Sequence, residues 1–269
     1  MFLLPALALL AIALACASLV RTGPMAASDA RERAASQASA TAPATAAATP
    51  RWRALLSQPP FLVVCALSLS LTLMREAFNT WSVDFLASVQ PPGARSLARA
   101  ALQSTGFDVA GAASILAMGV AYDRTPVRAR RFLLAGILTL LAALLALLPW
   151  AATRAPAAGA WLVGLAGLLV YGPYSLLAGV MAVECGGAAA AATAAGIIDA
   201  VGYVGAVLAG EGLGRVLDAG GYRLGFACLA AITAVSAIIA LALRPPRSDP
   251  PEPSTRQKAG AVARAGLPD

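Results

Sequence analysis

The segment SLTLMREAFNTWSVDFL, Ser70 to Leu86, places an arginine and a glutamate inside an apolar run that begins at Phe61. This run exceeds the about 20 residues that a helix needs to cross a lipid bilayer. A charged side chain at the centre of a bilayer costs about 2.5–3.5 kcal/mol on insertion scales and usually belongs to a functional path. Arg75 and Glu76 therefore indicate both a membrane-spanning helix and a candidate site.

The composition excludes an ordinary soluble domain. Hydrophobic residues make up 59% of the 269 residues and charged residues 12%, whereas a soluble domain carries about 25% charged residues. Histidine is absent, and the four cysteines stand far apart in or beside apolar stretches, so the usual Cys/His zinc pattern is missing. No catalytic motif is recognisable. The sequence predicts an integral membrane protein that is not an enzyme and has no cofactor.

The predicted fold class is all-α and polytopic, with about seven transmembrane helices. The apolar segments are 2–20, 61–88, 104–121, 132–150, 160–182, 192–216 and 222–243. We predict a single helix in residues 1–22, for which a secretory signal peptide is the alternative, and a six-helix bundle in residues 61–243. Residues 23–60 are expected to be a flexible cytoplasmic linker and residues 244–269 a disordered cytoplasmic tail.

The basic residues predict the orientation in the membrane. Of 20 Lys and Arg residues, five lie in residues 21–60, four in the loop after the third segment and five in the tail, against five in the opposite loops. Because basic loops stay in the cytoplasm, the C-terminus is predicted to be cytoplasmic. The expected location is the bacterial inner (plasma) membrane.

The second apolar segment carries one polar stripe. At 3.6 residues per turn, spacings of three and four place its members on one face. They are Cys65, Ser68, Thr72, Arg75, Asn79 and Ser82. This face is expected to line a water-filled cavity or the bundle interior.

Arg75 admits two interpretations. Its planar fork of donors suits a phosphate or a carboxylate, which predicts an anion-binding residue. Alternatively it forms a structural ion pair inside the bundle, with Asp108 or Asp199 as the candidate partner. These two aspartates and Glu76 form the predicted charge-pair or coupling set. Glu76 lies about 100° round the helix and is expected to point toward a neighbouring helix or the outer half of the membrane.

The fifth segment is expected to bend at Gly172-Pro173, because proline removes a helical hydrogen bond. Tyr171 and Ser175 are four residues apart and would line the cavity at this bend, whereas Tyr174 is expected to face elsewhere. Simple packing around a proline bend is the alternative. Together with Arg75, Asn79 and Ser82, Tyr171 and Ser175 form the predicted substrate-binding set.

Two further patterns concern movement and packing. GVAYDRTPVRARR, Gly119 to Arg131, resembles a loop motif of the major facilitator superfamily, and this resemblance implies a role in conformational change. The residues that fit the motif are Gly119, Asp123, Arg124, Arg128 and Arg130; a merely basic cytoplasmic loop is the alternative. The sixth segment carries small residues that permit close helix contact. These are Gly202, Gly205, Ala206, Ala209, Gly210 and Gly214.

These segments resemble the organophosphate:phosphate antiporters of the major facilitator superfamily, the glycerol-3-phosphate and hexose-phosphate exchangers. The stretch containing Arg75, Trp81, Ser82, Phe85 and Leu86 resembles the seventh helix of that family. FDVAGAASILAMGVAYDR, 107–124, resembles the eighth, and YGPYSLLAGVMAVE, 171–184, with AAAAATAAGIIDAVGYVGAVLAG, 188–210, resembles the tenth and eleventh. Glu76 replaces an aromatic residue that is frequent in the family, and Val83 replaces a frequent proline.

The resemblance implies the C-terminal half of a twelve-helix transporter, preceded by the equivalent of the sixth helix. In the family, one arginine from each half holds the phosphate, and Arg75 matches the arginine of the C-terminal half. The implied partners are the lipid bilayer, a phosphorylated small molecule, inorganic phosphate and a separate N-terminal six-helix half; no nucleic acid is expected. The implied function is antiport of a sugar phosphate or glycerol phosphate against phosphate. The alternatives are a membrane sensor of hexose phosphate and a proton-coupled antiporter that uses Asp108 or Asp199.

Overall fold

The computed structural model describes residues 51–91, 93 and 96–243, which belong to one compact unit. All regular secondary structure in this part of the chain is helical. The predicted first helix, 2–20, and the predicted tail, 244–269, lie outside the described residues. Residues 23–50 of the predicted linker also lie outside the described residues. Within the rest of the linker, Arg51–Leu56 forms a short helix.

The elements follow one another with short connections. They are α3 (Arg51–Leu56), α4 (Pro59–Ser88), α5 (Leu97–Arg124), α6 (Arg130–Arg154), α7 (Pro156–Leu176), the π-helical η1 (Leu177–Met181), α8 (Ala182–Val207), the π-helical η2 (Leu208–Gly212) and α9 (Leu213–Leu241). Prolines at the first turns of α4 and α7 suit positions where the N–H has no helical partner. Ser96 caps α5 by accepting a hydrogen bond from the Arg99 N–H at 3.3 Å.

Five continuous helical stretches of the described chain are long and apolar enough to cross a membrane. They are Pro59–Ser88, Leu97–Arg124, Arg130–Arg154, Pro156–Gly187 and Ala190–Leu241. The chain is thus all-α with several potential membrane spans, as the sequence predicted. The seven-helix count is not confirmed and remains a prediction.

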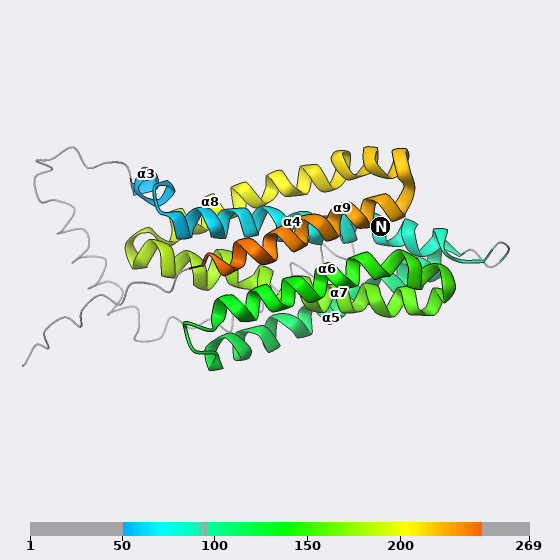
Figure 1. Ribbon diagram of the computed structural model, residues 1–269, viewed down its shortest axis with the longest axis horizontal. Helices are drawn as coiled ribbons and strands as arrows, with labels where there is room; N and C mark the ends of the chain where they lie inside the picture. The colour runs from blue at the N-terminus through cyan, green and yellow to red at the C-terminus, as the bar shows by residue number, and fades with distance from the viewer. Residues whose placement is uncertain (1–50, 92, 94–95, 244–269) are drawn as a thin grey trace, which may run out of the picture. The chain divides into compact units, whose positions relative to one another are not determined.

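The last stretch contains the two helices predicted at 192–216 and 222–243, and Gly221 separates them. Ala190–Leu241 has 52 residues, which as a straight helix would extend about 78 Å, more than twice the hydrocarbon core of a bilayer. Gly221 interrupts it with φ 66° and ψ −171°, a conformation that glycine adopts without a Cβ clash. The chain reverses there, so that the two segments run antiparallel (Figure 1). Gly187, with φ 60°, makes the corresponding break between α7–η1 and the body of α8.

Two pairs of helices approach closely at glycines. A Cβ on Gly167 of α7 would overlap the Phe107 carbonyl oxygen of α5, and a Cβ on Gly205 of α8 would overlap the Leu69 carbonyl oxygen of α4. The predicted close contact through small residues is therefore confirmed at Gly205. At Gly210 it is not, because a Cβ there would meet no atom within 4 Å. These approaches set the distances between the helices that carry the candidate site.

The core of the described bundle contains a cluster of stacked aromatic rings. Phe78 stacks on Phe107 with ring centroids 4.9 Å apart, and Phe226 lies edge-on to Phe85 at 4.8 Å. All four side chains are buried. Such ring pairs contribute about 0.5–1.5 kcal/mol beyond the burial of their area, and they hold α4 against α5 and α9.

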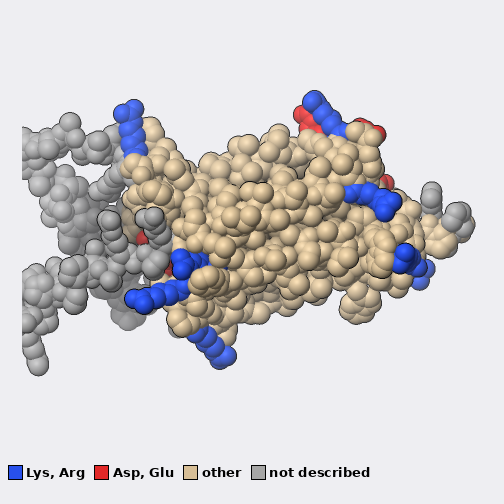
Figure 2. Space-filling model, in the orientation of Figure 1, with Lys and Arg blue, Asp and Glu red and all other residues tan. Residues whose placement is uncertain are grey.

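Charged side chains gather toward the two ends of the described bundle on the face that Figure 2 shows, and the middle of that face carries neither acidic nor basic groups. This distribution suits helices that cross a hydrocarbon layer, because uncharged groups meet the lipid chains. Together with the five apolar helices, it is consistent with an integral membrane protein.

Candidate functional site

A group of polar side chains lies in the middle of α4, α5, α7 and α8, and we call it the polar patch. Its members are Arg75, Glu76, Asn79, Asp108, Tyr171, Tyr174, Asp199 and Tyr203. Each is exposed or partly exposed in the described bundle, and each interacts with at least one other member. The patch therefore unites residues that are more than a hundred positions apart in the sequence.

Arg75 is the central cation of this patch. It is the seventeenth of the 30 residues of α4, close to the middle of the helix. Its Nη2 and Nε donate to Oε1 of Glu76 at 2.6 Å and 3.0 Å. From another side the guanidinium lies over the ring of Tyr174, 4.4 Å from the ring centroid. Arg75 is thus held by an ion pair and a cation–π contact.

Of the three carboxylates predicted for pairing or coupling, Glu76 is the one that pairs with Arg75. The sequence indicated Asp108 or Asp199, because adjacent helix positions diverge by 100°, but the ion pair joins Arg75 to Glu76. Both side chains are long enough to bend toward each other outside the helix surface, so the angle between their Cβ atoms does not prevent contact. The expectation that Glu76 points to another helix was wrong for the same reason.

Tyr174 is a member of the site that the sequence reasoning missed. It was expected to face elsewhere, but its ring packs against Arg75. The signal was present in the sequence: Tyr171 and Tyr174 are three residues apart, a spacing that places side chains on the same side of a helix. Pro173 lies between them inside α7, and the π-helical η1 begins four residues later at Leu177.

Two carboxylates complete the patch. The Tyr171 hydroxyl donates to Oδ1 of Asp108 at 2.8 Å, and Asp199 lies near Tyr174. Among the described residues neither aspartate has an arginine or lysine within ion-pair distance. Counting Arg75 and Glu76, the patch carries one positive and three negative formal charges.

The other predicted substrate-binding residues differ in their availability. Asn79 is exposed and interacts with Tyr171. Ser82 is only 3% exposed, and its hydroxyl bonds to that of Ser104 on α5 at 2.5 Å. Ser175 donates to the Gly172 carbonyl oxygen at 2.8 Å within its own helix. Asn79 is therefore the most accessible of the three, while Ser82 joins α4 to α5.

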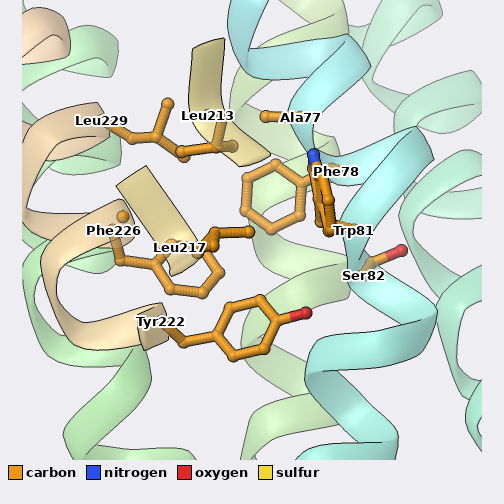
Figure 3. A pocket seen from close by; sticks show the side chains of 10 residues that line it. Ala77, Phe78, Trp81, Ser82, Leu213, Leu217, Tyr222, Phe226 and Leu229 are labelled. Atoms are coloured by element: carbon orange, nitrogen blue, oxygen red, sulfur yellow. The ribbon is translucent and has the colours of Figure 1, made fainter. Parts of the chain in front are cut away.

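An apolar pocket lies between α4 and the two segments that meet at Gly221 (Figure 3). It encloses roughly 290 Å³ of empty space, part of it open to the surroundings. Its lining comprises Ala77, Phe78, Trp81, Ser82, Leu213, Leu217, Tyr222, Gly225, Phe226 and Leu229. The indole N–H of Trp81 donates to the Ala209 carbonyl oxygen at 2.9 Å, and Tyr222 donates to Asp84. With its principal polar groups already bonded, this pocket offers little to a charged ligand, and the polar patch is the better candidate site.

The predicted loop motif forms one cross-helix contact. Asp123, Arg124 and Arg128 are exposed, and a Cβ on Gly119 would meet no atom within 4 Å. The contact is made instead by Arg130, near the end of the motif. Its Nη1 donates to Oε1 of Glu184 at 2.8 Å, and its guanidinium lies 4.1 Å from the centroid of the Tyr122 ring.

The Tyr122 hydroxyl donates to the same glutamate, at 3.2 Å from Oε2 of Glu184. Tyr122, Arg130 and Glu184 therefore form a small network, which joins the end of α5, the start of α6 and the start of α8. The arrangement ties three helices together at the end of the bundle that carries the motif.

This network predicts a measurable coupling between Arg130 and Glu184. In a double-mutant cycle with Arg130→Met and Glu184→Gln, we expect a coupling of about 1 kcal/mol in the free energy of unfolding in detergent, because partial burial and the Tyr122 contact reinforce the pair. The same cycle on Arg215 and Glu211, whose side chains are 78% and 70% exposed, should give about 0.3 kcal/mol. Equal values for the two pairs would contradict the role assigned to Tyr122.

The comparisons with known proteins add no relative: no protein-family model matches the chain, and no curated protein matches it.

Proposed function

We propose that the described helices form one half of a secondary transporter that exchanges a phosphorylated metabolite, a sugar phosphate or glycerol phosphate, for inorganic phosphate. The polar patch carries this proposal. Its ionic groups lie near the middle of helices that are apolar enough to cross a membrane. Contact of such groups with lipid is costly, so they face a water-lined path or a second protein body.

Arg75 is the residue that would hold the phosphoryl group. A guanidinium binds phosphate through two parallel hydrogen bonds, which combine charge with a fixed orientation. Tyr174 lies against the guanidinium and supports it in the patch. Asn79 and Tyr171, at the edge of the same patch, would contact the organic part of the substrate.

The partner in this proposal is an N-terminal six-helix half that covers the polar patch from the other side. Transporters built from two bundles bind their substrate near the bilayer midplane, at the interface of the bundles, and alternate access by rocking around it. The network of Tyr122, Arg130 and Glu184 would stabilise one of the two arrangements, because it ties helix ends that must shift during rocking. The protein would act in the bacterial inner membrane with its C-terminus in the cytoplasm.

A second candidate function is proton-coupled antiport of another substrate, and the charge balance of the patch favours it. Asp108 and Asp199 have no cation partner among the described residues, and Arg75 already has one in Glu76. Carboxylates inside a transporter commonly take up and release protons during the cycle. In this case Asp108 or Asp199 would carry the proton, and phosphate would have no part in transport.

Exchange in membrane vesicles separates the two candidates. Vesicles from host cells that overexpress the complete transporter, the chain together with its N-terminal half, are loaded with labelled phosphate. They are expected to release the label when glycerol 3-phosphate or glucose 6-phosphate is added outside. Vesicles from cells that lack the chain serve as the control. The release should persist when an uncoupler removes the proton gradient. Transport that requires the gradient and ignores phosphate would contradict the phosphate exchange and support proton-coupled antiport.

A further inference from the structure

The Arg75 donors that would bind phosphate are occupied by Glu76. Both the Nη2 and the Nε of Arg75 donate to a single oxygen of Glu76, at 2.6 Å and 3.0 Å. These two bonds use two of the five N–H donors that the guanidinium fork presents to an anion. An incoming phosphate must therefore displace the glutamate or bind beside it.

The two contacts of Arg75 differ in what an anion can replace. Tyr174 makes a cation–π contact, with the Cζ of Arg75 4.4 Å from the ring centroid, so this contact uses no N–H···O hydrogen bond of the fork. Glu76, in contrast, accepts hydrogen bonds from the Nη2 and Nε donors. The side chains of Arg75 and Glu76 are 18% and 27% exposed, so the ion pair is accessible from outside the bundle. Exchange of one anion for another at Arg75 therefore needs no rearrangement of Tyr174.

We infer that Glu76 is an internal competitor for Arg75 and thereby selects dianionic phosphates over monoanions. This inference rests on the proposed function. Glu76 is attached to the residue next to Arg75, so its local concentration at the guanidinium is far higher than that of any dissolved carboxylate. A dissolved monoanionic carboxylate offers the same chemical group as Glu76 but lacks this high local concentration. It therefore cannot displace Glu76 from Arg75.

A phosphate group has the means to displace the glutamate. At neutral pH a phosphomonoester carries about −1.5 to −2 charges and three acceptor oxygens. Two of its oxygens can accept parallel hydrogen bonds from one edge of the guanidinium fork, and the third remains for Asn79 or Tyr171. The released Glu76 carboxylate remains part of the polar patch, which also contains Asp108 and Asp199, and the negative charge of these groups weakens the binding of every anion. Glu76 thus lowers affinity and increases selectivity at once.

The neutral variant Glu76→Gln tests the inference on the full chain in lipid nanodiscs, with inorganic phosphate and acetate as probes in calorimetric titrations. Removal of the competing charge-assisted hydrogen bonds is expected to tighten phosphate binding by about 10-fold to 100-fold. Acetate, which should not bind the unmodified chain, is expected to bind the variant. The matched control is Glu211→Gln, which neutralises an exposed glutamate that pairs with Arg215 outside the patch and should leave both titrations unchanged.

A second readout follows Arg75 directly. Phenylglyoxal modifies accessible guanidinium groups, and mass spectrometry of the peptide that contains Arg75 reports the rate. The rate is expected to rise about 10-fold in Glu76→Gln and to fall again when phosphate is present. Glu76→Asp, which retains the charge on a side chain shorter by one methylene, should give intermediate values. If Glu76→Gln lowers the amount of folded protein, Glu76→Asp replaces it in the titrations and in the modification experiment.

The outcomes distinguish this inference from the proposed function. Equal phosphate affinity for the unmodified chain and for Glu76→Gln, with equal modification rates, would overturn the inference and leave the phosphate site at Arg75. Weaker phosphate binding in Glu76→Gln would also overturn it, because Glu76 would then position Arg75 for the anion. Absence of phosphate binding in both proteins, with no protection of Arg75, would overturn the inference and the proposed function together.

Discussion

Replacement of Arg75 by lysine is expected to reduce phosphate exchange in membrane vesicles by at least about 100-fold, which corresponds to about 2.7 kcal/mol. Lysine keeps the positive charge but loses the planar fork, so it cannot bind phosphate through two parallel hydrogen bonds. It also loses the cation–π contact between the guanidinium and the Tyr174 ring. Loss of one partner of a hydrogen-bonded charge pair costs about 2–5 kcal/mol, and the expected loss of about 2.7 kcal/mol for Arg75→Lys lies within this range.

The control for this substitution is Arg215→Lys. Arg215 also pairs with a glutamate, Glu211, but both side chains are largely exposed and stand outside the polar patch. Exchange by this variant should equal that of the unmodified protein. Full exchange by Arg75→Lys, with labelled phosphate released at the normal rate, would remove Arg75 from the proposed site. Immunoblots of the vesicles check that both variants reach the membrane in equal amounts.

The second large effect is expected at Gly167. In Gly167→Ala the new Cβ overlaps the Phe107 carbonyl oxygen, and a backbone atom cannot rotate away as a side chain can. α5 and α7 must therefore move apart, which we expect to cost about 3 kcal/mol of the free energy of unfolding, at the upper end of overpacking effects. The hydrogen bond from Tyr171 to Asp108 joins the same two helices and should weaken as well.

The matched control at a helical glycine is Gly136→Ala. A Cβ at Gly136 in α6 would meet no atom within 4 Å. Since alanine favours the helix over glycine, this change should stabilise the protein by about 0.5–1 kcal/mol. Thermal unfolding in detergent, monitored by circular dichroism, measures the stability of both variants. A Gly167→Ala protein as stable as the unmodified chain would show that α5 and α7 adjust without cost.

The positions of the helices were predictable because their apolar lengths match a bilayer and because glycines and prolines lie at their ends. The pair Gly220-Gly221 at the last reversal and Pro156 at the start of α7 are examples. The polar stripe on α4 was likewise evident from spacing, and it contributes Arg75 and Asn79 to the patch. Local periodicity contains this information, since it depends on residues only three or four positions apart.

The pairing within the site was not predictable to the same degree. Spacing along a helix describes Cβ directions, but Arg75 and Glu76 meet at the ends of long side chains that bend away from those directions. Tyr174 was missed because its role depends on the approach of α7 to α4. The contact between Arg130 and Glu184 joins residues 54 positions apart, and the loop motif alone does not indicate which of its arginines reaches the acid.

The unpaired aspartates of the polar patch have a consequence for biogenesis. If the described bundle stood alone in lipid, Asp108 and Asp199 would each cost about 2.5–3.5 kcal/mol at mid-depth. The sum, about 5–7 kcal/mol, is comparable to the entire folding free energy of a typical domain. If the chain is one half of a transporter, as proposed, a newly inserted copy would be marginally stable until it docks, and membrane proteases would keep its abundance in step with that of its companion half.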